Sequence, residues 1–121
     1  MHQVNFPAVC GMDAHQRSQL VLDWRDRRAV ACAEHPALSL GALPEADLSV
    51  SRRPVSRHHA RIERRRQSWV LVDHSCNGSF VQTEDEQVTF VRRGEVRLWG
   101  EGWISLGEPL TEESAIRFRH D

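Results

Sequence analysis

The sequence predicts an all-β fold, an antiparallel β-sandwich. Short apolar runs recur along most of the chain, and several of them alternate with polar residues in the two-residue period of a strand. Clusters of Gly, Pro, Asp, Asn and Ser separate these runs, and no stretch has a convincing helical period. Many short strands joined by turns indicate a sandwich, and a partly open barrel is the alternative that periodicity leaves open.

The first element is a hairpin. Apolar side chains alternate along residues 20–24, and the charged run 25–28 then turns the chain into the apolar residues 29–33. Strands at residues 38–40 and 48–50 follow, because each is a short run rich in Leu or Val. A segment that contains Gly and Pro separates the two runs.

The middle strands flank the most unusual polar segments of the chain. Residues 60–63 alternate Ala and Ile with charged side chains, residues 69–73 form an apolar run, and residues 80–82 follow an Asn-Gly turn signal. The remaining strands are short runs of apolar and aromatic residues. They are expected at residues 88–91, 96–99, 103–106 and 116–119.

Length and composition fit one folded domain. The chain has 121 residues and a mass of 13.9 kDa, and 40% of its residues are hydrophobic and 27% charged, which is the balance of a globular protein. Residues 1–18 show no clear periodicity and contain Pro7 and Gly11, so we expect a leader or linker that is partly disordered. Residues 19–121 are the expected domain.

Membrane insertion and export are not indicated by the sequence. No apolar run approaches the roughly 20 residues of a membrane helix, and the start lacks the charged and apolar regions of a signal peptide. A cytoplasmic location is therefore expected. Cys10, Cys32 and Cys76 are an odd number at wide spacing, so we expect free thiols rather than a disulfide framework or a zinc knuckle.

Arginine is unevenly distributed, although the net charge is only −1. Residues 51–66 contain seven arginines and one acid, Glu63. Arg61 and Glu63 alternate with apolar residues, which is the pattern of a solvated sheet face, and residues 64–66 are expected in a hairpin turn. We therefore expect no nucleic-acid binding.

Two polar loops hold the side chains best suited to bind an anion. Residues 51–60 include Ser56 and Arg57, and residues 73–81 include Asn77. A hydroxyl, a guanidinium and an amide offer the donors that a phosphate monoester requires. In the alternative interpretation, Ser56 caps a turn, Arg57 is solvated and Asn77 shapes a hairpin. Spacing alone favours this alternative.

Metal and catalytic sites are less well supported. His58, His59, His74 and Cys76 are potential zinc ligands, but their spacing fits no closed site, and adjacent strand residues face opposite ways. Ser56 near His59 offers only superficially the nucleophile and base that an enzyme would need. We expect no metal, no cofactor and no enzymatic activity.

Four segments resemble the successive signatures of forkhead-associated (FHA) domains: LSLGALPEADLSV, VSRHHARI, WVLVDHSCNGSFV and GEGWISLG. Their Ser-Arg-x-His-Ala and Asn-Gly-Ser elements lie about twenty residues apart with a strand between them. The resemblance covers roughly residues 20–107. Segments 59–81 and 91–107 look most like FHA domains attached to bacterial class III adenylate or guanylate cyclases, so a linked cyclase is an expected intramolecular partner.

The resemblance implies a β-sandwich of about eleven strands that binds phosphothreonine peptides or proteins through loops at one end. Ser56 resembles the serine whose hydroxyl meets the phosphate, and Arg57 the residue beside it that contacts phosphate or peptide. His59 resembles the histidine that supports the loop from beneath. Asn77 matches the asparagine that holds the peptide backbone, and Gly78 the glycine that lets the turn form.

Further positions follow the family pattern less closely. Cys76 falls where a hydroxyl residue often helps to bind phosphate, and Gln82 where a second asparagine often lies. The family's Gly-Arg pair is Gly41-Ala42 in this sequence, so the arginine that pairs with phosphate is absent. Loss of such a charge-assisted contact weakens binding by about 1.5 to 3 kcal/mol, or more than tenfold.

Two functional hypotheses remain from the sequence. In one, the domain is a phosphothreonine-binding signalling module with a degenerate site, and Arg52 or Arg53 supplies a substitute charge. In the other, it is a phospho-independent interaction or regulatory domain, acting on a linked cyclase. Neither hypothesis involves a membrane.

Overall fold

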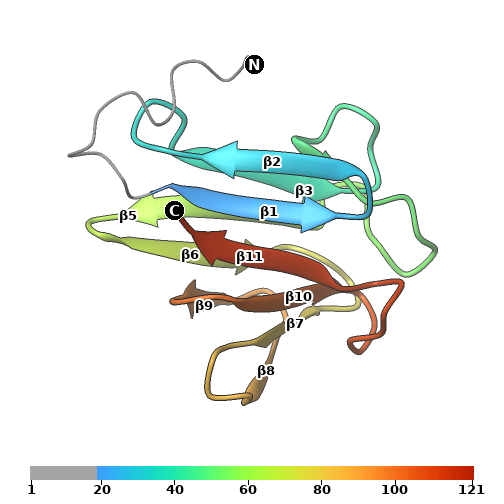
Figure 1. Cartoon of the computed structure of the whole chain (residues 1–121). Coiled ribbons are helices and arrows are strands. Elements are labelled where there is room, and N and C mark those ends of the chain that lie inside the picture. The colour runs from blue at the N-terminus through green and yellow to red at the C-terminus, as the bar shows by residue number, and fades with distance from the viewer. Residues whose placement is uncertain (1–18) are drawn as a thin grey trace.

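The computed structural model describes residues 19–121, and this part of the chain is built from strands and loops without a helix (Figure 1). The expected leader, residues 1–18, lies outside the described residues. Two sheets pack face to face, which confirms the predicted β-sandwich. The strands are β1 (Leu20–Trp24), β2 (Arg27–Ala31), β3 (Ala37–Gly41), β4 (Leu48–Ser49), β5 (Ala60–Arg65), β6 (Ser68–Asp73), β7 (Ser79–Gln82), β8 (Val88–Val91), β9 (Glu95–Leu98), β10 (Gly102–Leu106) and β11 (Ile116–His120).

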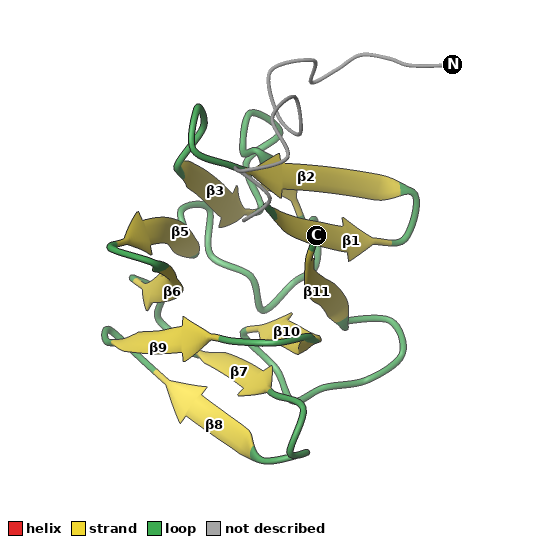
Figure 2. Ribbon diagram, turned by 60° about the vertical axis from the view of Figure 1, so that its left-hand side comes forward, coloured by secondary structure: helices red, strands yellow, loops and turns green. Residues whose placement is uncertain are grey.

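The two sheets have different strand orders. One has six strands in the order β2-β1-β11-β10-β7-β8 (Figure 2). The other has five in the order β4-β3-β5-β6-β9. Neighbouring strands run antiparallel except for the parallel pair β3 and β4. The first and last strands, β1 and β11, pair in the middle of the six-stranded sheet and close the domain.

The core lies between the two sheets. Alternate side chains of each strand face inward, as the burial pattern of β6 shows: Trp69, Leu71 and Asp73 are buried, and the residues between them are half-buried. Removing this apolar surface from water supplies the main stabilising free energy. The largest fully buried side chains are Trp69, Phe118, Leu20, Leu22, Leu40, Leu48, Ile62, Leu71, Leu98, Ile104, Leu106 and Ile116.

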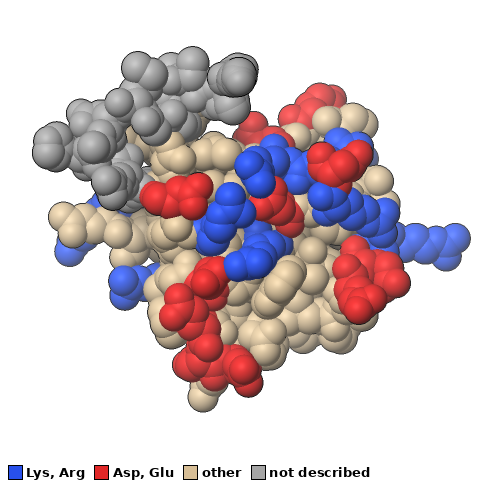
Figure 3. Space-filling model, in the orientation of Figure 1, with Lys and Arg blue, Asp and Glu red and all other residues tan. Residues whose placement is uncertain are grey.

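The outer face of the six-stranded sheet carries paired charges. Figure 3 shows acidic and basic side chains interspersed over much of this face. Arg119 contacts Asp23 on the neighbouring strand at 2.9 Å, and Arg117 pairs with Glu101. Surface pairs of this kind each stabilise the fold by roughly 1 kcal/mol or less, so they contribute little to its stability.

The predicted strands are confirmed, with bounds that differ by at most two residues. The hairpin turn after β5 is shorter than expected, because β5 extends to Arg65 and leaves Arg66 and Gln67 as the turn. Arg64 belongs to the strand opposite Trp69, and its guanidinium lies 5.3 Å from the centroid of the Trp69 ring. This cation–π contact gives the extension a local stabilising interaction.

The cysteines differ in state. Cys76 is a free, exposed thiol, as predicted. Cys32 is buried and disulfide-bonded, so the prediction of a free thiol is wrong there. No helix among residues 19–121 is long and apolar enough to cross a membrane. The cytoplasmic location stays a prediction. A disulfide at Cys32 does not favour it, because disulfides persist mainly in oxidising compartments.

Candidate functional site

Two loops that are distant in the chain meet at one end of the sandwich. Residues 50–59 join β4 to β5, and residues 74–78 join β6 to β7. Ala60 at the start of β5 lies opposite Asp73 at the end of β6, so both loops leave the five-stranded sheet at the same edge. These two segments are called the paired loops below.

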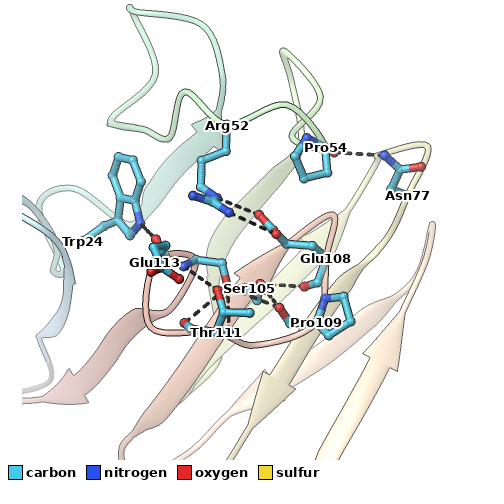
Figure 4. A network of polar contacts seen from close by, with 10 residues as sticks. Trp24, Arg52, Pro54, Asn77, Ser105, Glu108, Pro109, Thr111 and Glu113 are labelled. Carbon is cyan, nitrogen blue, oxygen red and sulfur yellow. Dashed lines mark hydrogen bonds and ion pairs between the residues drawn. The ribbon is translucent and has the colours of Figure 1, made fainter.

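Hydrogen bonds connect the paired loops directly. The backbone N–H of Cys76 donates to Ser56 Oγ at 3.4 Å. The Asn77 side-chain amide donates to the carbonyl oxygen of Pro54 at 3.0 Å (Figure 4). A hydroxyl from one loop and an amide from the other are thereby held on a common surface.

His59 supports both loops from beneath. Its side chain is completely buried. The backbone N–H of Ser56 donates to His59 Nδ1 at 3.0 Å, so the proton of the neutral ring is on Nε2, which donates to the Gly78 carbonyl at 2.8 Å. Both ring nitrogens are therefore committed to the backbone, and neither serves as a base for the Ser56 hydroxyl.

Burial lowers the pKa of His59 below its ordinary value of 6.5, although the bond to Gly78 and the nearby Asp73 carboxylate act in the opposite direction. His59 Nε2 lies 3.6 Å from Asp73 Oδ2, beyond hydrogen-bonding distance. The ring is thus held neutral, as its two backbone hydrogen bonds require.

Asp73 organises the second of the paired loops. Its buried carboxylate accepts hydrogen bonds from the Ser75 backbone and hydroxyl at 2.8 and 2.9 Å and from the Ser79 hydroxyl at 2.6 Å. A fourth bond comes from the Arg93 N–H at 3.1 Å. Burial alone raises the pKa of Asp73, but these bonds lower it by more, so the carboxyl is ionised and fixes the loop between β6 and β7.

Gly78 occupies a position that a side chain does not fit. Its φ is +84°, and a Cβ there would overlap the ring of Phe90. Its N–H donates to Ser75 Oγ at 2.7 Å, and its carbonyl accepts the Gly107 N–H at 2.8 Å in addition to the His59 ring. The turn places the neighbouring Asn77 on the surface.

The end of β3 also approaches the first paired loop closely. A Cβ on Gly41 would overlap the carbonyl oxygen of Arg57, so the contact requires a glycine. The N–H of Ala42 donates to the Ser56 carbonyl at 3.0 Å. Ala42 is half-buried against the hydrophobic core, and this hydrogen bond holds its backbone beside that of Ser56.

A third loop, residues 107–115, neutralises one of the candidate cations. Arg52 forms a two-pronged contact with Glu108, with distances of 2.6 and 3.1 Å (Figure 4). The pKa of Arg52 is raised chiefly by this hydrogen bond. Because the guanidinium is occupied, Arg53 rather than Arg52 remains as a candidate substitute for the family arginine. Arg53 is exposed and makes no hydrogen bond or ion pair with residues 19–121.

Arg57 lines a hollow next to the paired loops. The hollow has a volume of about 280 Å³ and is lined in part by Arg57, His58, His74 and Leu43. Within the described part of the chain, the Arg57 side chain has no hydrogen bond or ion pair, so its guanidinium is uncommitted. The structure thus brings Ser56 and Asn77 together and leaves Arg53 and Arg57 as unpaired cations on the first loop.

Gln82 lies apart from the paired loops. It is at the far end of β7, three residues and roughly 10 Å from Ser79, and its amide donates to the Glu86 carbonyl at 3.2 Å. The Cys76 thiol is exposed, whereas its backbone N–H faces Ser56. The sequence did not predict a role for this N–H or for the Pro54 carbonyl, because the residue type does not indicate which backbone groups take part in a site.

Metal binding finds no support in the described structure. No group of three or more His, Cys, Asp or Glu residues within residues 19–121 is placed to hold a metal ion. Among the candidate ligands, His59 is buried and bonded to the backbone through both nitrogens.

Comparison with protein families identifies the domain. The FHA domain model matches residues 38–99, which is about half of the chain and includes both paired loops. The chain belongs to the FHA family. A comparison with curated proteins found no match.

Solved FHA structures share the fold. FHA-1 of Mycobacterium tuberculosis Rv1747 is 21% identical, with a TM-score of 0.68 over 86% of this chain and 97% of that one. M. tuberculosis EmbR, in complex with a low-affinity phosphopeptide, is 23% identical, with a TM-score of 0.62 over 86% of this chain and 25% of EmbR. The FhaA FHA domain, complexed with the intracellular domain of Rv3910, is 25% identical, with a TM-score of 0.58 over 84% and 98%.

The buried state of His59 predicts a pH dependence of stability. Because its pKa is lower in the folded than in the unfolded state, the unfolded chain binds more protons below pH 6.5, and the free energy of unfolding falls as the pH drops from there toward the folded value. Urea denaturation followed by tryptophan fluorescence measures this loss. NMR of the histidine rings should show His59 as the Nε2–H tautomer, titrating below 6.5. An Nδ1–H tautomer, or a His59 pKa above 6.5, would contradict the two hydrogen bonds by which the ring holds Ser56 and Gly78.

The close approach at Gly41 predicts a destabilising substitution. In Gly41→Ala, the new methyl group meets the Arg57 carbonyl, so the free energy of unfolding should fall by about 1 to 3 kcal/mol as the loop is displaced. Gly94→Ala is the matched control, because the nearest atom to its added Cβ is the Val91 side chain at 3.3 Å. Equal losses in the two variants, measured by urea denaturation, would mean that β3 and the loop are not in tight contact.

Proposed function

We propose that residues 19–121 form a phosphothreonine-binding signalling module whose site is the surface of the paired loops. The observation that carries the proposal is the meeting of Ser56 Oγ and the Cys76 N–H, which come from different loops and are held by His59 and Asp73 below. The long 3.4 Å bond between them is easily exchanged for bonds to a phosphate oxygen.

The charges of the first paired loop support binding of a phosphate monoester, which carries about −1.5 to −2 charges at neutral pH. Arg53 and Arg57 are exposed and unpaired within residues 19–121. Each guanidinium can donate two parallel hydrogen bonds to phosphate. We assign Ser56, Arg57 and the Cys76 backbone to the phosphate, with Arg53 as an additional cation.

Asn77 is suited to hold the peptide backbone. Its Nδ2 is fixed on the Pro54 carbonyl, which orients the amide, and its Oδ1 has no partner within the described residues. An oriented acceptor on the surface can receive a peptide N–H without first losing a protein hydrogen bond. Gln82 is left out of the proposed contacts, because its amide is bound to Glu86 at the other end of β7.

Ala42 gives the proposed site a weak affinity. A methyl group stands where the family has an arginine, and Glu108 occupies the neighbouring Arg52. Two similar FHA structures are compatible with this function: EmbR is in complex with a low-affinity phosphopeptide, and FhaA is in complex with a protein domain. These complexes of EmbR and FhaA make phosphopeptide or protein binding the first property to test in the present chain.

The same observation at Ala42 favours a second function, in which the domain binds its partner without phosphate. A partner in the same protein, such as a linked nucleotide cyclase, is the form of this hypothesis that the sequence resemblance suggests. It requires equal binding of phosphorylated and unphosphorylated partners. Neither function includes a catalytic step. His59 is not available as a base for Ser56, because both of its ring nitrogens are bonded to the backbone.

Peptide titration separates the two functions. A degenerate library of phosphothreonine peptides should bind the protein at least about tenfold more tightly than the same peptides without phosphate, because charge-assisted bonds are lost with it. Ser56→Ala should remove most of this difference. Ser51→Ala is the matched control, since Ser51 is exposed and has no bond to the second paired loop. Equal affinity for both forms of the library would establish the phospho-independent function instead.

Restoring the family arginine tests the reason for weak binding. Ala42→Arg places a guanidinium beside Ser56, to whose carbonyl the residue 42 N–H is bonded, so affinity for phosphothreonine peptides should rise about tenfold. Ala37→Arg adds the same charge at the other end of β3 and should have little effect. Because Ala42 is half-buried, the folded state of the variant is checked by its thermal transition. A folded Ala42→Arg variant with unchanged affinity would reject this explanation.

A further inference from the structure

Strand β8 is an open edge with an apolar outer face. It is the last strand of the six-stranded sheet, and Figures 1 and 2 both draw it as the outermost strand. Val88 and Phe90 are 53% and 51% exposed, the highest values among the large hydrophobic residues of the described chain. The Phe90 ring packs at a tilt against the ring of Phe80 of β7, with ring centroids 4.9 Å apart. The apolar surface therefore continues onto the next strand.

The free hydrogen-bonding groups of β8 belong to the two exposed apolar residues. Thr83 donates to the Gln87 carbonyl at 3.3 Å, which makes these two a hydrogen-bonded pair of the β7–β8 hairpin. Antiparallel pairs alternate, so Thr89 and Val91 also bond toward β7. Val88 and Phe90 therefore direct their N–H and C=O groups away from β7, toward the open edge.

The sequence around β8 is complementary to itself in the antiparallel direction. With Thr89 opposite Thr89 of a second copy, Val88 lies opposite Phe90 and forms a hydrogen-bonded pair with it. Glu86, in the turn before β8, then comes to the same end of the joined strands as Arg92 of the other copy, which follows directly after β8. Both side chains are exposed, and neither has an ion-pair partner within residues 19–121. Two-fold symmetry makes each of these contacts twice.

We propose that two copies of this chain associate through antiparallel pairing of β8 with β8 around Thr89. The pairing joins the two six-stranded sheets, satisfies the open N–H and C=O groups of Val88 and Phe90, and brings the Glu86 end of each β8 to the Arg92 end of the other. The charges favour the antiparallel direction, because a parallel arrangement would bring Glu86 to Glu86 and Arg92 to Arg92.

The interface is small, so the association is weak and reversible. One four-residue strand with its neighbouring aromatic side chains lies at the low end of the area of specific interfaces. The paired loops remain accessible. Val91 at the end of β8 pairs with Ser79, next to Asn77 and Gly78, and the two-fold axis therefore places the two sets of paired loops at opposite ends of the joined strands. The inference does not depend on what those loops bind.

Charge reversal tests the antiparallel direction of the pairing. Sedimentation equilibrium of the whole chain between about 10 μM and 1 mM should show a monomer–dimer equilibrium. Glu86→Arg should raise the dimer dissociation constant about tenfold, since two attractive contacts become repulsive, and Glu86→Arg/Arg92→Glu should restore it. Glu45→Arg makes the same charge change on the loop after β3 and should have no effect. A wild-type chain that stays monomeric, or a double variant as weak as the single one, would overturn the proposal.

Cysteine cross-linking tests the two-fold axis. In a Cys76→Ser background, which removes the exposed native thiol, Thr89→Cys places two cysteines directly opposite each other. A non-hydrogen-bonded antiparallel pair has Cα atoms about 4.5 Å apart, within the range of a disulfide. Val88→Cys faces Phe90 of the other copy instead. Under mild oxidation, Thr89→Cys should give at least about fivefold more covalent dimer than Val88→Cys. Equal yields from the two variants would exclude pairing around Thr89.

Discussion

The two hydrogen bonds of the His59 ring are the interaction on which the proposed site depends. One goes to the Ser56 N–H and the other to the Gly78 carbonyl, which is 19 residues away from His59 in the chain, so a single buried side chain fixes both loops. A neutral imidazole is the group suited to this task, because it presents one acceptor and one donor on opposite sides of a rigid ring. The neighbouring buried Asp73 fixes the second loop in a similar way. Its ionised carboxylate accepts hydrogen bonds from N–H and O–H groups of residues 75, 79 and 93. Together the two residues convert flexible connections into a surface with fixed donors.

The electrostatics of the domain separate structural charges from available ones. Arg52, Arg61 and Arg65 lie in the basic stretch, but each has a carboxylate partner, in Glu108, Glu63 and Glu95 respectively. Arg53 and Arg57 have none within the described residues, and both are on the first paired loop. The uneven arginine distribution therefore bears on the proposed site at two positions rather than as a patch. This also accounts for a chain whose net charge is near zero but whose proposed function is to bind an anion: specificity rests on a few oriented donors.

Much of the fold followed from the sequence, because strand periodicity and turn residues are local signals. All eleven strands were placed within two residues, but the turn expected at residues 64–66 is shorter, since Arg64 and Arg65 belong to β5 and Arg64 contacts the Trp69 ring, a contact that depends on tertiary structure. The site was predicted less completely. Side chains such as Ser56 and Asn77 have recognisable spacing, but the Cys76 N–H, the Pro54 carbonyl and the Arg52–Glu108 pair depend on how loops meet. The position of Gln82 shows the same limit, since its place in a motif did not specify the direction in which its amide turns.

We propose that the paired loops act as one anion-binding surface. Backbone and arginine side-chain NMR signals test this directly, during titration of the whole chain with a phosphothreonine peptide and with its unphosphorylated form. The phosphorylated peptide should shift the N–H signals of Ser56, Cys76 and Asn77 together with the Nε–H of Arg57, and the unphosphorylated peptide should leave them nearly unchanged. Phosphate-dependent shifts that map to another surface, or that affect only one of the two loops, would contradict it.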